Sequence, residues 1–242
     1  MMRLDRLLAT KANLRGRARR AALASGTVRV GDKVVTDGAT QVGRFERVVF
    51  GAELVRALVP RYVLLHKPAG YVSATIDAEH PTVLDIVVPT ADSGPLHLAG
   101  RLDRATTGAV LITNDGLWSA RITEPTRHVA KTYLVTTAED IPHDLIGAFD
   151  QGVELPGDGI LTRPSELALL DSKQARLVLH EGRHHQVKRM FGAFGIRVTA
   201  LHREQVGEVG LDGLDQGEWR DLAPEEVRGL AEPDGSMAIA KA

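Results

Sequence analysis

An aspartate between two arginines is the feature of the sequence best suited to chemistry. Asp103 lies in the stretch GRLDRATTG (residues 100–108), with Arg101 and Arg104 close on either side. Nearby cations favour an ionised carboxylate and typically lower its pKa by about 1–3 units. An ionised carboxylate that is held rigidly can act as a nucleophile or as a base. The competing interpretation is a surface ion pair that caps a turn, and the spacing leaves both open.

A second candidate segment is EGRHHQVKRMF (residues 181–191), which carries Arg183, Lys188 and Arg189 near the start of an expected helix. Basic side chains at a helix N-terminus bind anions such as phosphate. Neighbouring residues of a helix diverge by about 100°, so His184 and His185 would not face one metal ion. We therefore expect no metal site here, and interpret the histidines as capping, packing or RNA-contacting residues.

A tyrosine near the start of an expected strand is the third candidate. In Lys131-Thr132-Tyr133 the side chains alternate between the two faces of the sheet. Tyr133 can point into a cleft and stack on a base, which is worth about 1–3 kcal/mol at single-stranded sites. The alternative is a core tyrosine with a satisfied hydroxyl. The stretch KPAGY (residues 67–71) predicts only a rigid turn at the end of a strand.

These candidates need a scaffold of strands and helices, and the hydrophobic pattern after residue 60 predicts both. Strands are expected at 62–66, 109–113, 131–137, 175–180 and 198–202. Helices are expected at 117–123, 142–149 and 184–194. Because strands and helices do not alternate regularly, an α+β fold is favoured over a doubly wound parallel one.

The N-terminal segment has a different organisation. Leucines at helical spacing predict a helix over residues 3–11, and a second helix is expected over 16–24, ended by Gly26. A hairpin is expected from 28–30 to 34–35, with its turn at Gly31-Asp32. Pro60 marks the expected boundary, so we predict domains at 1–59 and 60–230. Residues 231–242 are expected to form a frayed tail.

The charge of the chain is unevenly distributed along these segments. The formal net charge is -1, but residues 1–59 hold 12 Lys+Arg against 5 Asp+Glu, and the other residues hold 18 against 26. The N-terminal segment therefore carries +7 and the remainder -8. Such asymmetry predicts a basic module that meets a polyanion, attached to a less basic body. A solvated basic face without a partner is the alternative.

Composition excludes several classes of protein. The chain has no cysteine, which rules out disulfide scaffolds, thiolate metal sites and a cysteine nucleophile. No apolar run approaches the ~18–20 residues of a transmembrane helix, and the N-terminus lacks the apolar core of a signal peptide. We expect a soluble cytoplasmic protein, and no helix or strand demands a partner, so we expect a monomer.

Taken together, the segments resemble the pseudouridine synthase family, and in particular its bacterial ribosomal small-subunit branch. RLDRLLA and GTVRVGDKVVTDGA resemble an S4-type RNA-binding module. The motifs of the body, in the order of the family, are YVLLHKPAGYVSA, HPTVLDIV, GRLDRATTGAVLITNDG, KTYLV, EGRHHQVKRMFGAFG and LHREQVG. These motifs span most of the chain, and their order makes coincidence implausible.

The resemblance implies an α+β fold with a small S4-like domain followed by a synthase domain, whose mixed, largely antiparallel central sheet is flanked by helices and loops. It implies isomerisation of a uridine in 16S ribosomal RNA, of the uridine-516 type, without metal or organic cofactor. A large-subunit (23S) enzyme of the same family is the first alternative. A non-catalytic ribosome-assembly factor is the second, a hydrolase using Asp103 the third, and a structural ribosomal protein the fourth.

The resemblance also assigns roles to residues. Asp103 matches the essential carboxylate, Tyr133 the tyrosine that packs on the flipped base and handles a proton, and Lys188 the basic partner of the aspartate. Predicted RNA contacts are Arg3, Arg6, Arg15, Arg17, Arg19, Arg20, Lys67, Arg101, Arg104, Arg183, His185, Gln186, Arg189 and Arg203. The sequence departs from the family pattern at His66, where relatives have Asn, and at His184, where Asn or Tyr is common.

Overall fold

A computed structural model gives the structure of the protein and describes residues 1–157 and 159–232. The chain forms two compact units, Met1–Arg61 with Pro89–Pro95, and Tyr62–Val88 with the chain from Leu96 onward. Each unit has its own apolar core, and each is described by itself. Of the predicted frayed tail, residues 233–242 lie outside the described residues, and Ala231 ends a helix.

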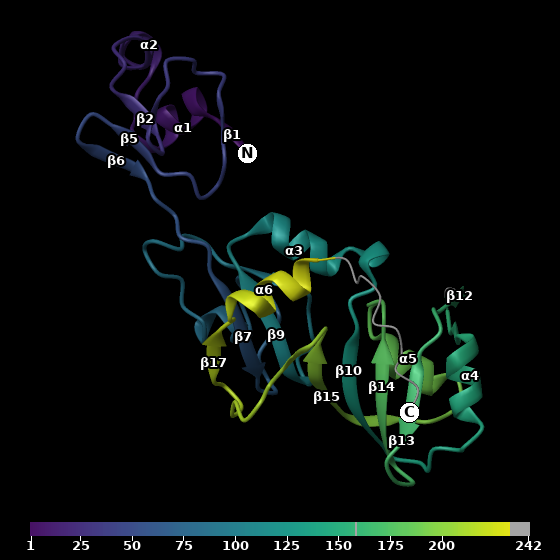
Figure 1. The fold of residues 1–242 in the computed structure, drawn as a ribbon. Helices are drawn as coiled ribbons and strands as arrows, with labels where there is room; N and C mark the ends of the chain where they lie inside the picture. Colours follow the sequence, from purple (N-terminus) through teal and green to yellow (C-terminus); the bar gives the residue numbers. More distant parts are fainter. Residues whose placement is uncertain (158, 233–242) are drawn as a thin grey trace. The chain divides into compact units, whose positions relative to one another are not determined.

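The first unit packs two helices against a small sheet (Figure 1). Helices α1 (Leu4–Lys11) and α2 (Gly16–Ala24) confirm the predicted ranges, and Leu4, Leu7 and Leu8 are buried as their spacing predicts. The sheet has the order β3-β2-β5-β6. Its strands are β2 (Val28–Val30), β3 (Lys33–Val34), β5 (Val48–Phe50) and β6 (Glu53–Arg56), while β1 (Met2–Arg3) pairs with β4 (Gln41–Val42). The predicted hairpin is β2–β3.

The second unit is built on one sheet with the strand order β13-β14-β10-β15-β9-β7-β17. Along the chain these strands are β7 (Tyr62–Lys67), β9 (Thr107–Thr113), β10 (Lys131–Thr137), β13 (Glu166–Leu169), β14 (Gln174–Leu179), β15 (Val198–Val206) and β17 (Trp219–Asp221). Short β8 (His97–Ala99) pairs with β9, and β16 (Val209–Gly210) pairs with β15. Of these pairings, β15–β9 is parallel and the others are antiparallel. The sheet is therefore mixed and largely antiparallel, and the fold is α+β, as predicted.

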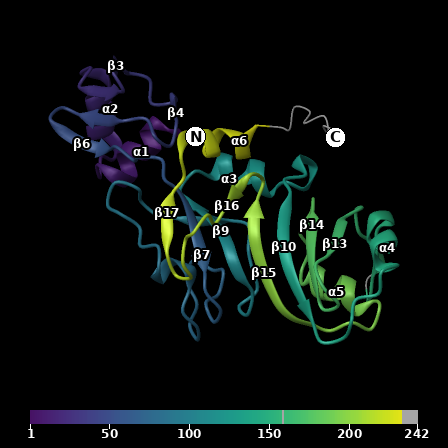
Figure 2. The same ribbon diagram turned by 60° about the horizontal axis from the view of Figure 1, so that its bottom comes forward.

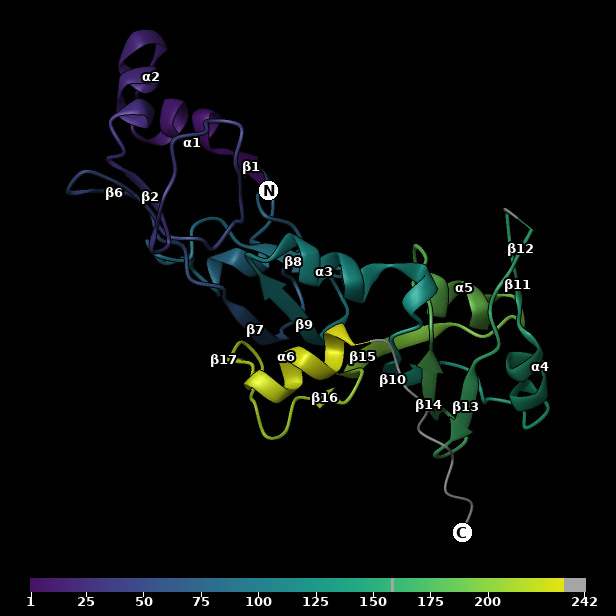
Figure 3. The ribbon, with the colours of Figure 1, turned by 45° about the horizontal axis from the view of Figure 1, so that its top comes forward.

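Alternation along the central strands gives the sheet two buried faces. Leu64 and Leu111 face a cluster with α3 (Gly116–Thr123) and α6 (Pro224–Ala231), whose contact includes a hydrogen bond of 2.9 Å from the Trp118 indole to the Val227 carbonyl. Val110 faces the larger cluster, which includes side chains of α4 (Leu145–Gln151) and α5 (Gln186–Gly192). Figure 3 shows these two helices at the β13–β14 end of the sheet.

The parallel pair at the centre requires a glycine. Gly108 lies opposite Arg203, and Figure 2 shows β15 between β9 and β10. A Cβ atom on Gly108 would lie 2.2 Å from the Arg203 carbonyl oxygen, and its φ of +113° is one that other residues rarely adopt. Glycine therefore permits the close approach of β9 and β15 directly after the segment that contains Asp103.

Two predicted helices are shorter than expected. The predicted helix 142–149 is α4, which begins at Leu145 after a turn in which the Leu145 amide bonds the Pro142 carbonyl. The predicted helix 184–194 is α5, which begins at Gln186 because His185 has a left-handed φ of +50°. Several short elements were not predicted, namely β4–β6, β8, β13, β16, β17, the pair β11 (Glu154–Leu155) and β12 (Ile160–Leu161), and the 3-10 turns η1 (Val83–Asp85) and η2 (Pro125–Arg127).

Candidate active site

A cavity of about 760 Å³ lies in the second unit and brings most of the candidate residues together. Its walls come from the segment before β9, from β10, β14 and β15, and from the turn that leads into α5. The predicted residues that line it are Arg101, Asp103, Arg104, Tyr133, Arg183, His185, Gln186, Lys188 and Arg203. Six cationic side chains and three carboxylates line this cavity, so it carries a formal excess of three positive charges with histidines neutral.

Asp103 has a basic side chain at each carboxylate oxygen. The Lys188 ammonium donates to Oδ2 at 3.1 Å, and His185 Nε2 lies 3.5 Å from Oδ1. The Asp103 side chain is 29% exposed, so a molecule in the cavity can reach it. The pairing of Lys188 with Asp103 that the resemblance implies is thus present in the geometry, and His185 joins it.

The segment that carries Asp103 is held by its neighbours on both sides. The Ser73 hydroxyl donates to the Leu102 carbonyl at 2.8 Å and accepts from the Leu102 amide at 3.0 Å. The Thr106 amide donates to the Asp103 carbonyl at 3.0 Å, which closes a turn. Because Ser73 is buried, it fixes the residue next to Asp103 without competition from water.

Lys67 belongs to the same support, and its predicted role as an RNA contact is wrong. The side chain is fully buried, and its ammonium donates to the carbonyls of Pro68, Arg104 and Thr106 at 3.0, 3.1 and 2.8 Å. Burial lowers the pKa of Lys67 to about 8, against the opposite effect of the Asp103 charge. The lysine therefore clamps the backbone around Asp103 and is closed to RNA.

The two adjacent histidines differ from the helical interpretation. They precede α5, and their rings stack with centroids 3.8 Å apart. His184 therefore supports the ring of His185, which faces Asp103. Within residues 1–157 and 159–232, no three His, Cys, Asp or Glu side chains group as metal ligands. His66 does not line the cavity; its Nδ1 lies 2.6 Å from the Leu214 carbonyl oxygen.

Gln186 lines the cavity but is hydrogen-bonded within the protein, and its predicted contact with RNA stays a prediction. It is buried at the start of α5, where its amide nitrogen donates to Glu181 at 2.8 Å and its oxygen accepts from the Arg183 amide at 2.9 Å. Glu181 also accepts from the Arg163 amide at 3.0 Å and from Arg183 Nε at 3.2 Å. These bonds fix the turn that presents His185 and Lys188.

Tyr133 belongs both to the core and to the wall of the cavity, and its predicted stacking on a base stays a prediction. Its side chain is buried in the core cluster, and it also lines the cavity from β10. Arg203 lies opposite it on β15, is 2% exposed, and donates from Nε to the Ala109 carbonyl at 2.7 Å. Lys131 lines the same cavity and was not among the predicted site residues. Lys131 lies two residues before Tyr133 on the same strand, so the two side chains lie on one face of the sheet. The sequence therefore contained the signal that would have predicted Lys131 as a site residue.

The other predicted contacts lie at the surface. Arg101, Arg104 and Arg183 are exposed around the cavity, and Arg104 approaches the His80 ring at 3.2 Å. Arg189 does not line the cavity and donates to the Pro156 carbonyl at 2.9 Å.

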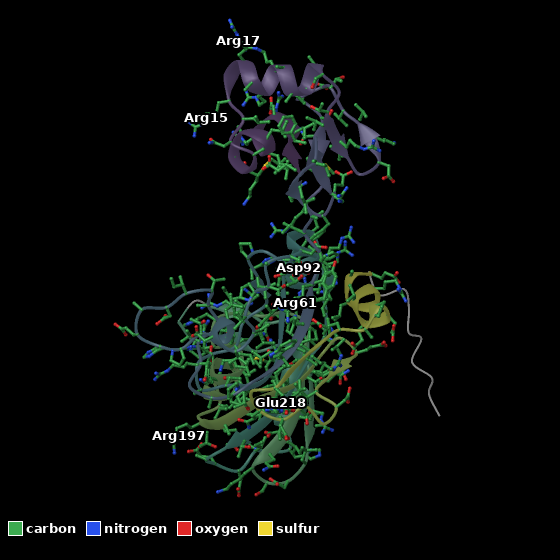
Figure 4. All side chains as sticks on the ribbon, turned by 90° about the vertical axis from the view of Figure 1, so that its left-hand side faces the viewer. Arg15, Arg17, Arg61, Asp92, Arg197 and Glu218 are labelled. Carbon is green, nitrogen blue, oxygen red and sulfur yellow. The ribbon has the colours of Figure 1, made fainter. Side chains whose placement is uncertain are left out.

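In the first unit, Arg3, Arg6, Arg15, Arg17 and Arg20 are exposed. Figure 4 shows the side chains of Arg15 and Arg17 extending away from the ribbon. Arg19 is half-buried and donates to the Asp5 carbonyl at 3.4 Å, while Arg3 pairs with the Asp5 carboxylate at 2.8 Å. The structure therefore leaves these predicted RNA contacts as predictions, with Arg3 and Arg19 partly engaged within the protein.

Comparisons with known proteins show the family to which the chain belongs. The model of the RNA pseudouridylate synthase family matches residues 61–193. Ribosomal small subunit pseudouridine synthase A of Pseudomonas aeruginosa is 46% identical over 228 residues, which cover 93% of this chain and 99% of the relative. The enzyme of that name from Escherichia coli K12 is 42% identical over 229 residues, with 93% and 98% covered. A crystal structure of a pseudouridylate synthase superposes with a TM-score of 0.68 at 37% identity, covering 95% of this chain and all of the other.

The fold and the cavity define an RNA-modifying isomerase with a carboxylate at its centre. The chain belongs to the RNA pseudouridylate synthase family, and it is an RNA pseudouridine synthase. Among the described residues, no helix is both long and apolar enough to cross a membrane.

Proposed function

We propose that the protein isomerises one uridine of small-subunit (16S) ribosomal RNA, of the uridine-516 type. The relatives from P. aeruginosa and E. coli are both ribosomal small subunit pseudouridine synthases, which supports a small-subunit substrate, and nearly the full length of each relative is matched. Ribosomal RNA as the substrate would place the enzyme in the cytoplasm.

The observation that carries the mechanism is the Asp103 carboxylate between Lys188 and His185 in a cavity lined by Tyr133. In the reaction, the bond from uracil N1 to ribose C1′ breaks and a bond from C5 to C1′ forms. The C5 hydrogen is lost as a proton, and N1 gains one, so the product has the composition of the substrate. Asp103 is the essential carboxylate in this scheme and acts as nucleophile or base, which the charge of Lys188 favours.

Access to the glycosidic bond requires the nucleotide to leave its stack, at a cost of a few kcal/mol. Stacking of the base on an aromatic ring offsets about 1–3 kcal/mol of that cost. Tyr133 is the aromatic side chain that lines the cavity. We assign it to the face of the flipped uracil, where its hydroxyl can hold or move a proton.

The first unit is proposed as an S4-like RNA-binding domain. Residues 1–59 carry a formal +7, and the side chains of Arg15 and Arg17, at the start of α2, extend away from the ribbon (Figure 4). Contacts of this kind bind phosphates and position an enzyme without reading bases. Their contribution to affinity depends on salt.

Mapping of pseudouridines in ribosomal RNA from a strain without this protein tests the substrate. The expected result is the loss of one pseudouridine in 16S RNA, restored by the wild-type gene. Loss of a 23S site instead would assign the enzyme to the large subunit. An unchanged map would contradict ribosomal RNA as its substrate.

A further inference from the structure

Two cationic side chains that line the cavity, Lys131 and Arg203, have no role in the proposed chemistry. Lys131 on β10 and Arg203 on β15 both line the cavity next to Tyr133. Arg203 is 2% exposed, and its Nη2 atom is buried without a hydrogen-bond partner in the protein. A buried guanidinium nitrogen without a partner is costly, and an acceptor oxygen from a ligand or a water molecule would satisfy it.

Three carboxylates line the cavity, those of Asp103, Glu124 and Glu181, but among the described residues none of them forms an ion pair with Lys131 or Arg203. Within the described part of the chain, Lys131 and Arg203 form no ion pair, and the Lys131 ammonium donates to the Val129 carbonyl at 2.8 Å. Glu181 acts on Lys131 electrostatically but is bound to Arg163, Arg183 and Gln186. Asp103 is engaged by Lys188 and His185.

The two cations also repel each other. Burial first, and then the charge of Arg203, lower the pKa of Lys131 to about 8. An anion placed between the two side chains would relieve both effects. In an RNA strand the group with a permanent negative charge is the phosphodiester, and Lys and Arg are its usual partners.

We infer that Lys131 and Arg203 form a subsite for a phosphodiester of the RNA strand next to the flipped uridine. The cavity of about 760 Å³ has room for more than the uracil. The subsite would hold the sugar-phosphate backbone on one side of Tyr133 and bring C1′ to Asp103. The inference rests on the proposed function only in that the ligand is RNA, and it does not depend on which uridine is modified.

Two probes test the subsite without turnover. In Asp103→Asn protein, the binding of uridine 5′-monophosphate, uridine 3′-monophosphate and uridine is compared by calorimetry. A subsite for phosphate predicts that one of the two nucleotides binds more tightly than uridine. In D103N/K131Q this preference should fall by about tenfold or more, since a hydrogen bond to a charged group is lost. D103N/K131R, which keeps the charge, should retain most of it.

The salt dependence of RNA binding gives the second readout. For a single-stranded contact, removal of one phosphate partner lowers the slope of log affinity against log salt by about 0.7. Lys131→Gln should show this decrease, whereas Arg203→Lys, which keeps the positive charge, should leave the slope close to that of the parent. The matched control is Arg176→Gln, because Arg176 on β14 pairs with Glu204 at 2.8 Å and does not line the cavity. Its slope should stay that of the parent.

Arg203 also bonds the Ala109 carbonyl, so melting temperatures must show that each variant is folded. Lys131→Gln keeps the test decisive if Arg203→Lys is unstable. An unchanged slope and an unchanged nucleotide preference in a folded Lys131→Gln protein would overturn the inference. A weaker affinity with an unchanged slope would also overturn it, because that result indicates contact with a neutral base. Neither result would bear on whether 16S RNA is the substrate.

Discussion

Lys188 and His185 give Asp103 two basic neighbours at separate oxygen atoms, which restrains the orientation of the carboxylate plane. The Lys188 ammonium can also rotate among three donors, whereas an arginine would hold the carboxylate in a planar fork. The geometry therefore assigns Lys188 to the orientation of Asp103 within the cavity. This contact is more than a third exposed on the lysine side, so its main effect is expected on catalysis and not on stability.

Lys188→Gln should lower kcat by about 10- to 100-fold, because a charge-assisted hydrogen bond to Asp103 is lost. KM should change little, since the Asp103 carboxylate and the Tyr133 ring remain in the cavity wall. Lys188→Arg should restore most of the rate. Single-turnover measurements of pseudouridine formation check both variants, and a glutamine variant with the wild-type rate would remove Lys188 from the mechanism.

Lys67 gives a prediction about pH. Its pKa is about 8 in the folded protein against an ordinary 10.5, so between these values the unfolded chain binds more protons. The contribution of Lys67 to the free energy of unfolding therefore increases as the pH rises from about 8 to 10.5. Below pH 8, Lys67 is protonated in both states, and its contribution does not change with pH. Denaturant titrations of the wild type and of Lys67→Met over this range should show a growing difference. If the difference in free energy of unfolding between the two proteins stays constant over this pH range, the pKa of Lys67 is not lowered by burial.

At the scale of elements, the site depends on where strands and turns meet. The segment before β9 presents Asp103, β10 and β15 present Tyr133 and Arg203, and the turn before α5 presents His185. The parallel pairing of β9 with β15 places Arg203 next to the segment that contains Asp103. Gly108 is the residue that allows it.

Gly108→Ala should destabilise the protein by about 3 kcal/mol or more, because the Cβ atom would meet the Arg203 backbone at a positive φ. Gly116→Ala is the matched control: a Cβ atom there has no neighbour within 4 Å, and Gly116 is the first residue of α3. That variant should be as stable as the parent or slightly more so. Thermal unfolding of both variants measures this difference. Equal stabilities of the two variants would refute the close packing of Gly108 against the Arg203 backbone.

The elements with a clear period were predictable from the sequence, and those set by tertiary contacts were not. Strand β10 has its predicted bounds, and the leucines of α1 are buried as their spacing predicts. The clamp by Lys67 could not be predicted, because two of the three carbonyls that accept from its ammonium, those of Arg104 and Thr106, belong to residues distant in the sequence. The start of α5 was missed because His185 adopts a left-handed conformation within a network around Glu181 and Gln186.

At the scale of the whole molecule, the uneven charge of the chain separates two tasks. The second unit holds the candidate catalytic residues in one cavity, and the first unit carries several exposed arginines. Because Pro89–Pro95 belongs to the first unit, a simple truncation at residue 59 would leave a part of it behind. Charge replacement in the full chain is the cleaner test of the division.

The triple change Arg15→Gln, Arg17→Gln and Arg20→Gln should weaken RNA binding and lower its salt slope by about 2–3, if each side chain meets a phosphate. The rate at saturating RNA should be unchanged, since none of the three lines the cavity. Arg197→Gln, an exposed arginine of the second unit (Figure 4), serves as the control. A triple variant with wild-type affinity and slope would contradict an RNA-docking role for the first unit.

The most direct test of the account is pseudouridine formation by Asp103→Asn protein on the 16S RNA of a strain that lacks the enzyme. The change keeps the shape of the side chain and removes the charge between Lys188 and His185. We predict a loss of rate on the order of 10⁴-fold, as for other essential catalytic groups, with RNA binding and melting temperature retained. Wild-type conversion of the uridine by the folded variant would contradict the assignment of Asp103 as the essential carboxylate.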